Sequence, residues 1–177
     1  MPEIDLRGNP WTSAFPREEQ LVGRELYRLL TIFAASPALA GLQQSDEGGC
    51  VYSWSIRSFE YPEIGRILVS LAAMLRTDWD ADPGRVDGNL SLMHPNKDTG
   101  VLIPSLEKPS ETARLSLRES LNKILHAYTM NLDRSQGPSI YDGHLNPRVH
   151  LYGEKAGTRW KATLEIHAWA EMVHSIG

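Results

Sequence analysis

The sequence has little cysteine and little net charge, and it lacks long apolar runs. Its single cysteine, Cys50, excludes an internal disulfide and a cysteine-based zinc site. A formal net charge of −4 gives no overall attraction for nucleic acid, so contact with RNA would need a local basic patch. No apolar run approaches the roughly 20 residues that span a bilayer, and the start of the chain lacks the features of a secretory signal. We therefore expect a cytoplasmic protein with no membrane partner.

The composition is that of a folded globular protein. The 177 residues are 41% hydrophobic and 23% charged, which is ordinary for one domain that buries its own core. No internal repeat or low-complexity tract divides the chain. We expect a single domain over 1–177, with an irregular lead-in over 1–15 and a long connection over 78–108.

Apolar residues at helical spacing predict the main helices. The first is expected over 16–36. Because proline cannot continue the hydrogen-bond ladder, it should stop at Pro37 or restart there as a short turn to Gly41. The second is expected over 62–77, before the turn chemistry of the DWDADPG segment. The third and longest is expected over 110–132, with Ser110 as its N-cap.

Alternating patterns predict a small antiparallel sheet. Residues 50–58 alternate apolar and polar side chains, as in a half-buried strand. Two further apolar segments flank the sequence GEKAG, which reads as a hairpin turn, and 166–176 fits a short amphipathic final helix. Short extended pieces are expected at 90–93 and 101–103. The fold class expected is α+β and mostly helical, with three main helices and a small antiparallel sheet that includes the C-terminal hairpin.

The tryptophans are expected to contribute to the core, because each offers a large apolar area. Trp54, Trp160 and Trp169 fall in segments predicted as strands or helix, and Trp11 is expected to anchor the lead-in. Trp79 is the exception, since it lies in the acidic segment predicted as a loop.

A row of polar residues lies along the helix predicted over 110–132. Arg118, Asn122 and His126 recur at intervals of four residues, which places them on one side of a helix and away from its apolar face. A histidine can exchange a proton with a ribose 2′-hydroxyl or a leaving oxygen. An arginine offers a permanent positive charge to a phosphate, and an asparagine can orient the base or a phosphate oxygen. Cleavage of RNA needs little more than these roles, and no metal ion or other cofactor.

The segment that carries this row, 117–127 (LRESLNKILHA), resembles the signature helix of HEPN-type proteins. In that family, small helical domains pair so that an Arg…His motif from each chain meets at the interface. Many members are metal-independent ribonucleases of toxin–antitoxin and phage-defence systems, and others bind nucleotides or RNA. The resemblance implies a homodimeric, HEPN-like RNA-binding protein or endoribonuclease. It also implies Arg118 and His126 as the catalytic pair, with Asn122 as the polar accessory.

Other cations are candidates for substrate contact. Lys123 lies on the same predicted helix as the polar row. His94 and Lys97 belong to the 78–108 connection, and they would join the site if that connection folds over the helix. We therefore include all three as substrate-binding candidates.

Other interpretations remain open. The polar row on the helix can be solvated or satisfied by a neighbouring loop. It can equally be the contact face of a non-catalytic interaction module, such as an antitoxin, immunity or accessory protein that binds a partner protein. Asp142, His144 and His150 carry metal-capable groups, but a further clear ligand is missing nearby, so no metal site is expected.

Overall fold

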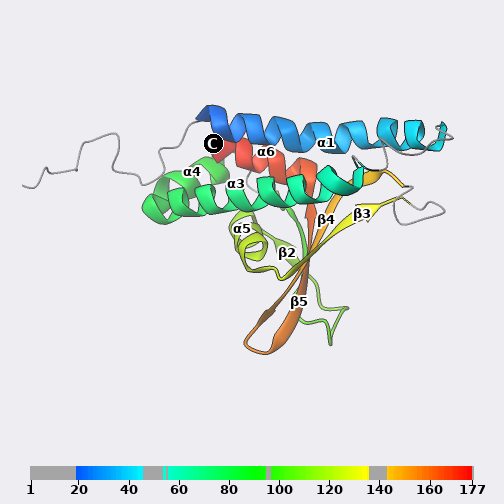
Figure 1. Ribbon diagram of the computed structural model, residues 1–177. Helices are drawn as coiled ribbons and strands as arrows, with labels where there is room; N and C mark the ends of the chain where they lie inside the picture. Colours follow the sequence, from blue (N-terminus) through cyan, green and yellow to red (C-terminus); the bar gives the residue numbers. More distant parts are fainter. Residues whose placement is uncertain (1–18, 46–53, 55, 95–96, 136–142, 177) are drawn as a thin grey trace, which may run out of the picture.

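The chain forms an antiparallel sheet with helices packed on one of its faces. The computed structural model describes residues 19–45, 54, 56–94, 97–135 and 143–176. Strands β4 (Leu145–Lys155) and β5 (Thr158–Glu165) form a hairpin whose turn projects away from the helices (Figure 1). The α+β class expected from the sequence is confirmed, and so are the C-terminal hairpin and the final helix, α6 (Ile166–Ile176).

The sheet is larger than the sequence predicts. Within the described residues it has five strands in the order β2-β1-β5-β4-β3, and all neighbouring pairs are antiparallel. The three strands outside the hairpin are β1 (Gly100–Ile103), β2 (Ala113–Leu115) and β3 (Thr129–Arg134). The extended piece predicted at 101–103 is confirmed as part of β1. The remaining two strands come from a segment that the sequence predicts as helix or loop.

Alternation along the hairpin strands determines which face of the sheet meets the helices. Leu151 and Ala162 lie opposite each other in the register and are buried, whereas their neighbours His150 and Thr163 are partly exposed on the other face. The buried face packs against helices α1 (Glu19–Ser45), α5 (Leu117–His126) and α6. The sequence pattern and the packing therefore agree over the whole hairpin.

Helices α1, α3 (Tyr61–Ala81) and α6 form the long part of the helical layer (Figure 1). The apolar stripe predicted for the second helix is fully buried and consists of Ile64, Ile67, Leu68, Leu71 and Leu75. The inward side of the final helix is confirmed as well, because Trp169 and Val173 are buried. None of the helices in the described part of the chain combines the length and the apolar content needed to cross a membrane.

Helix α1 continues through Pro37, so the stop predicted there is wrong. Proline removes one backbone hydrogen bond, but packing on both sides of it keeps the helix in place. Ser36 is 1% exposed and its hydroxyl accepts a hydrogen bond from the backbone N–H of Leu145 at 2.9 Å. Ala40, one turn further on, is also buried. Tertiary packing therefore outweighs the local preference of the proline.

The DWDADPG segment joins two helices instead of starting a long loop. Helix α3 extends past Thr77 to Ala81, which buries Trp79 to 2% exposure, so its predicted exposure is wrong. Asp82 then caps α4 (Pro83–Met93), because its carboxylate accepts a hydrogen bond from the Arg85 backbone N–H at 3.1 Å. The extended piece predicted at 90–93 is consequently wrong, since those residues are helical.

The helix predicted over 110–132 is too long at both ends. It begins at Leu117, and its N-cap is Ser116 in place of Ser110: the Ser116 hydroxyl accepts a hydrogen bond from the Glu119 backbone N–H at 3.2 Å. Residues on either side of α5 are the strands β2 and β3. The polar row and the resembling segment still lie on a helix, but Tyr128 lies beyond it and is 62% exposed.

The strand predicted over 50–58 is wrong wherever the structure describes it. A π-helix, η1 (Ile56–Glu60), leads directly into α3, whereas 50–53 and 55 lie outside the described residues. Trp54 is 58% exposed, and its ring meets that of Phe59 edge-on with centroids 5.0 Å apart. Its predicted place in the core is therefore wrong, and Trp11 lies outside the described residues.

Candidate functional site

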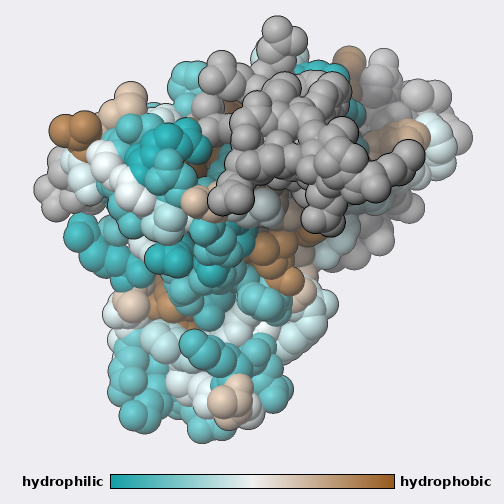
Figure 2. Space-filling model, turned by 90° about the vertical axis from the view of Figure 1, so that its left-hand side faces the viewer, coloured by the Kyte–Doolittle hydropathy of each residue, from teal (hydrophilic) through white to brown (hydrophobic). Residues whose placement is uncertain are grey.

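A polar cleft separates α5 from the end of the β4–β5 hairpin. Its volume is about 430 Å³. The residues that line it are Glu119, Asn122, Lys123 and His126 from the helix, and Glu154, Lys155 and Trp160 from the hairpin. Carboxylates, ammonium groups, an amide and an imidazole therefore share one cavity. The hairpin end of the molecule, at the bottom of Figure 2, has a mostly hydrophilic surface.

The helix side of the cleft follows from the spacing of the α5 sequence. Leu117 and Leu121 are buried in the core, which turns the opposite side of α5 towards solvent and the hairpin. Glu119, Lys123 and His126 are separated by four and three residues, so they lie above one another on one side of the helix. His126 is the last residue of α5 and is exposed.

The hairpin side depends on glycine at two positions. Gly157 (φ 81°) and Ala156 (φ 51°) form the tight turn, and glycine reaches positive φ without the strain that a side chain brings. Gly153 lies across from Trp160 in the register, and a Cβ at Gly153 would come within 2.0 Å of the Trp160 ring. The absence of a side chain at Gly153 therefore allows the indole to lie against the strand.

Lys123 connects the two sides of the cleft. Its Nζ lies 4.2 Å from the centroid of the Trp160 ring and 3.2 Å from a carboxylate oxygen of Glu119. The residue is only 8% exposed, so its ammonium group is held in place instead of moving freely in solvent. The cleft thus contains a positioned cation that is paired with the carboxylate of Glu119, and the imidazole of His126 lines the same cavity.

The structure brings Asn122, Lys123 and His126 together in this cleft, but it places Arg118 elsewhere. The Arg118 guanidinium lies 5.7 Å from the Trp79 ring centroid and 3.9 Å from a carboxylate oxygen of Asp80. Asn122 lies between the two regions, since its side-chain oxygen accepts a hydrogen bond from Arg76 at 2.7 Å. Arg118 and His126 therefore do not line the same cavity within one chain.

His94 and Lys97 contact α6 and do not line the cleft. The His94 Nε2 lies 2.6 Å from the Ser175 hydroxyl, and the Lys97 ammonium lies 2.6 Å from a carboxylate oxygen of Glu171. The ion pair with Lys97 lowers the pKa of Glu171. These contacts fasten the segment after α4 to the last helix.

The histidines near β4 are engaged with hydroxyl groups. His144 Nδ1 lies 3.0 Å from the Ser135 hydroxyl, and His150 Nδ1 lies 3.0 Å from the Thr163 hydroxyl. Asp142 lies outside the described residues. Across the ranges that the structure covers, no three histidine, cysteine, aspartate or glutamate side chains are grouped so that they could hold a metal ion.

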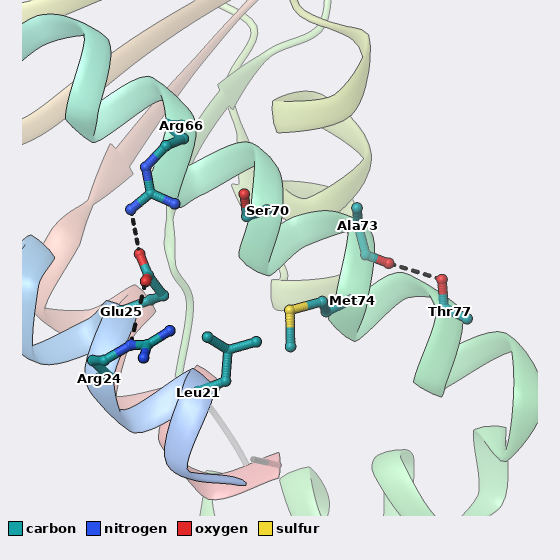
Figure 3. Close-up of a pocket in the computed structure, with 8 residues that line it drawn as sticks. All are labelled: Leu21, Arg24, Glu25, Arg66, Ser70, Ala73, Met74 and Thr77. Atoms are coloured by element: carbon teal, nitrogen blue, oxygen red, sulfur yellow. Dashed lines mark hydrogen bonds and ion pairs between the residues drawn. The ribbon is translucent and has the colours of Figure 1, made fainter. Parts of the chain in front are cut away.

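A second cavity, of about 410 Å³, lies between α1 and α3, but its charged groups are already paired (Figure 3). The buried carboxylate of Glu25 lies 2.6 Å from the Arg66 guanidinium. Arg66 also binds Glu63, and these hydrogen bonds raise the pKa of Arg66 and lower that of Glu63. The network joins two helices, and the rest of the cavity is mostly apolar. The α5 cleft contains a histidine and four further ionisable side chains, so it is the stronger candidate for chemistry.

Sequence reasoning missed the hairpin half of the cleft. The GEKAG turn is predicted correctly, but nothing in its local pattern says that Glu154 and Lys155 lie beside α5. One available signal was Gly153, because a glycine inside a strand often marks a close approach of another group. The helix half, including Glu119, follows from helical spacing alone.

The fold and the cleft define a two-layer α+β protein with a mixed-charge cavity at one end of a short helix. Comparisons of the chain with protein-family models, with characterised proteins and with solved structures found no match. The function is therefore inferred from the groups in the cleft and their positions.

Proposed function

We propose that the protein binds RNA in the α5 cleft and cleaves it by a metal-independent phosphoryl transfer. The observation that carries the proposal is the presence of Glu119, Lys123 and His126 in one cavity. These side chains supply a proton acceptor, a fixed cation and a proton donor, which are the groups that cleavage at a ribose phosphate needs.

The reaction proceeds by attack of the ribose 2′-oxygen on the adjacent phosphorus. Glu119 accepts the 2′-hydroxyl proton, the new O2′–P bond forms, and the bond from phosphorus to the 5′-oxygen breaks. His126 in its protonated form donates a proton to the departing 5′-oxygen. The products are a 2′,3′-cyclic phosphate and a free 5′-hydroxyl. Proton exchange with water restores both side chains.

The spacing on the helix suits this division of roles. Glu119 and His126 are seven residues apart, which corresponds to about 10 Å along the helix axis. Side chains at that separation can reach a phosphodiester from opposite sides, as in-line displacement requires. Lys123 lies between them and is placed to neutralise the phosphate oxygens, with Lys155 at the opposite wall.

The requirement for a 2′-hydroxyl gives a direct test. An oligodeoxynucleotide that contains a single ribonucleotide is incubated with the protein in the presence of EDTA. We expect cleavage only on the 3′ side of the ribose, and mass spectrometry should find a terminal 2′,3′-cyclic phosphate. The all-deoxy oligonucleotide is the matched control and should stay intact. Cleavage of that control, or no cleavage of either strand, would refute the proposed reaction.

A pair of substitutions separates the cleft from the Arg118 side of the helix. We expect Lys123→Gln to lower the rate of cleavage by about 100-fold, because a cation positioned for the transition state is lost. We expect Arg118→Gln to change it by less than about 3-fold, because that guanidinium binds near Asp80 outside the cleft. Rates are measured on the same chimeric oligonucleotide, with circular dichroism to verify folding. The opposite ranking would favour the Arg…His pairing that the HEPN resemblance implies.

The HEPN-like identity, the homodimer and the defence or toxin–antitoxin setting that this resemblance implies stay predictions. The proposed reaction does not require the second chain, since one chain supplies all the groups named above. The alternative of a non-catalytic interaction module predicts no cleavage of either oligonucleotide. The test with the single ribonucleotide therefore also discriminates between the two functions.

A further inference from the structure

An apolar groove lies at the edge of the core, between α3, the end of α5, the start of β3 and strand β4. Its volume is about 270 Å³. The residues that line it are Tyr61, Gly65, Leu68, Val69, Ile124, Ala127, Tyr128, Thr129, Met130 and Leu151. The volume lies near the lower end of the range for small-molecule sites, so it suits one planar ring system.

Exposed tyrosines flank this groove. Tyr128 is 62% exposed and Tyr61 is 46% exposed, which leaves much of both rings in solvent. The Tyr61 hydroxyl donates a hydrogen bond to the backbone carbonyl of Met130, and the Tyr128 backbone N–H donates to the Tyr152 carbonyl at 3.0 Å. Tyr61 is therefore held by its hydroxyl group and Tyr128 by its backbone N–H, while both residues stay exposed to solvent.

Glycine at position 65 lets the Met130 side chain lie close to helix α3 at the groove. A Cβ at Gly65 would lie 3.3 Å from the terminal methyl carbon of Met130, so a larger side chain would displace that methyl group and extend into the groove. Gly65 is inside helix α3, where glycine is less favourable than alanine by about 1 kcal/mol. Helix stability alone would therefore favour a residue other than glycine at position 65, which lines the groove.

The groove and the proposed cleavage site are lined by residues of the same two chain segments. Ile124 on α5 and Ala127 directly after it line the groove, whereas Lys123 and His126 on α5 line the cleft. Tyr128 follows His126 by only two residues. On β4, Leu151 lines the groove and Lys155 lines the cleft, a separation of about 13 Å along the strand.

We infer that the groove is a base-binding subsite for single-stranded RNA, with Tyr128 as its stacking platform and Tyr61 as its second wall. The inference rests on the proposed function, because the strand is held so that a base enters the groove while a neighbouring phosphate occupies the cleft. Single-stranded nucleic acid is recognised mainly through bases stacked on aromatic side chains. An apolar, aromatic groove near a cleft that contains Lys123 and Lys155 matches the base and the phosphate of a nucleotide.

The test measures binding without cleavage. The probe is a fluorescent single-stranded oligonucleotide with 2′-O-methyl groups throughout, which removes the attacking hydroxyl. We expect Tyr128→Ala to weaken its binding by about 5- to 150-fold, the range for loss of one stacked base, and Tyr128→Phe to retain binding. Tyr27→Ala is the matched control, since Tyr27 is 72% exposed on α1, and it should leave the Kd unchanged.

A second pair of variants tests the groove itself. Gly65→Leu extends a side chain into the groove and is expected to weaken binding to a similar extent, whereas Gly88→Leu on α4 has open space around it and should have no effect. A probe with one abasic position should bind the native protein less tightly. With this abasic probe, Tyr128→Ala should not weaken binding further, because the base that stacks on Tyr128 is already missing.

The outcomes separate this inference from the proposed reaction. Kd values for Tyr128→Ala and Gly65→Leu that stay within twofold of the native value would overturn the subsite, even if RNA is cleaved. Absence of any binding of the probe by the native protein would overturn it as well. Binding that depends on Tyr128 and Gly65 supports the subsite, and it does so even where the ribose test finds no cleavage and the proposed reaction fails.

Discussion

Replacing His126 with alanine is expected to lower the rate of RNA cleavage by about 100- to 10,000-fold, the range for loss of a general acid. The imidazole lies at the end of α5 in the cleft, and in the proposed reaction it supplies the proton for the departing 5′-oxygen. Without this proton, a charged alkoxide must leave. The measurement is the single-turnover rate on the oligonucleotide that contains one ribose.

The structure offers a closely matched control for this substitution. His167 is also an exposed histidine on a helix, but it lies on α6 beside a groove formed with α1. His167→Ala should leave the cleavage rate within about twofold of the native value. Because His126 is exposed, its loss should change the free energy of unfolding by less than about 0.5 kcal/mol. Equal cleavage by the native protein and His126→Ala would rule out the assigned role.

Helical spacing predicts a helix correctly where the apolar stripe of that helix contacts the core along its whole length. The stripe of α3, from Ile64 to Leu75, is an example, and every predicted member is buried. Helix ends are less predictable, because residue types such as aspartate and proline occur both in loops and at the start of helices. Asp82 and the proline after it fit a loop, but in the structure they cap a new helix, and burial of Trp79 favours that outcome.

Long-range pairing explains the largest error in the predicted fold. Leu132 continues the apolar spacing of α5, so local pattern alone extends the helix to it. In the structure, Leu132 belongs to β3 and pairs with Val149, seventeen positions along the chain. Hydrogen bonds between distant segments leave no mark on local periodicity, and strand preference depends strongly on such contacts.

In the candidate site, too, local spacing is predictable from the sequence and contacts between distant segments are not. Glu119, Asn122, Lys123 and His126 share one side of α5 because of their spacing, so the sequence predicts their proximity. The position of Trp160 against Lys123, and the exclusion of Arg118, depend on which elements lie beside the helix. Geometry within one helix is accessible from sequence, whereas the opposite wall of a cleft comes from tertiary packing.

The tryptophans give the second large prediction, because Trp54 and Trp169 have the same predicted place in the core but opposite environments. Trp169 is 0% exposed, and its indole N–H donates a hydrogen bond to the Ser120 hydroxyl of α5 at 3.1 Å. Replacing it with alanine should lower the free energy of unfolding by about 3 to 5 kcal/mol, because a large cavity forms at the α5–α6 contact. Trp54→Ala should lower it by less than about 1 kcal/mol, because only a mostly exposed edge contact with Phe59 is lost.

Urea denaturation followed by far-ultraviolet circular dichroism compares the two variants without relying on tryptophan fluorescence. If Trp169→Ala does not fold, Trp169→Phe keeps most of the apolar volume and removes the hydrogen bond, for which we expect a loss of about 1 to 3 kcal/mol. Since Ser120 is buried on the helix that carries His126, this contact joins α6 to that helix. Equal losses of stability for Trp54→Ala and Trp169→Ala would contradict the burial of Trp169 at the contact between α6 and α5.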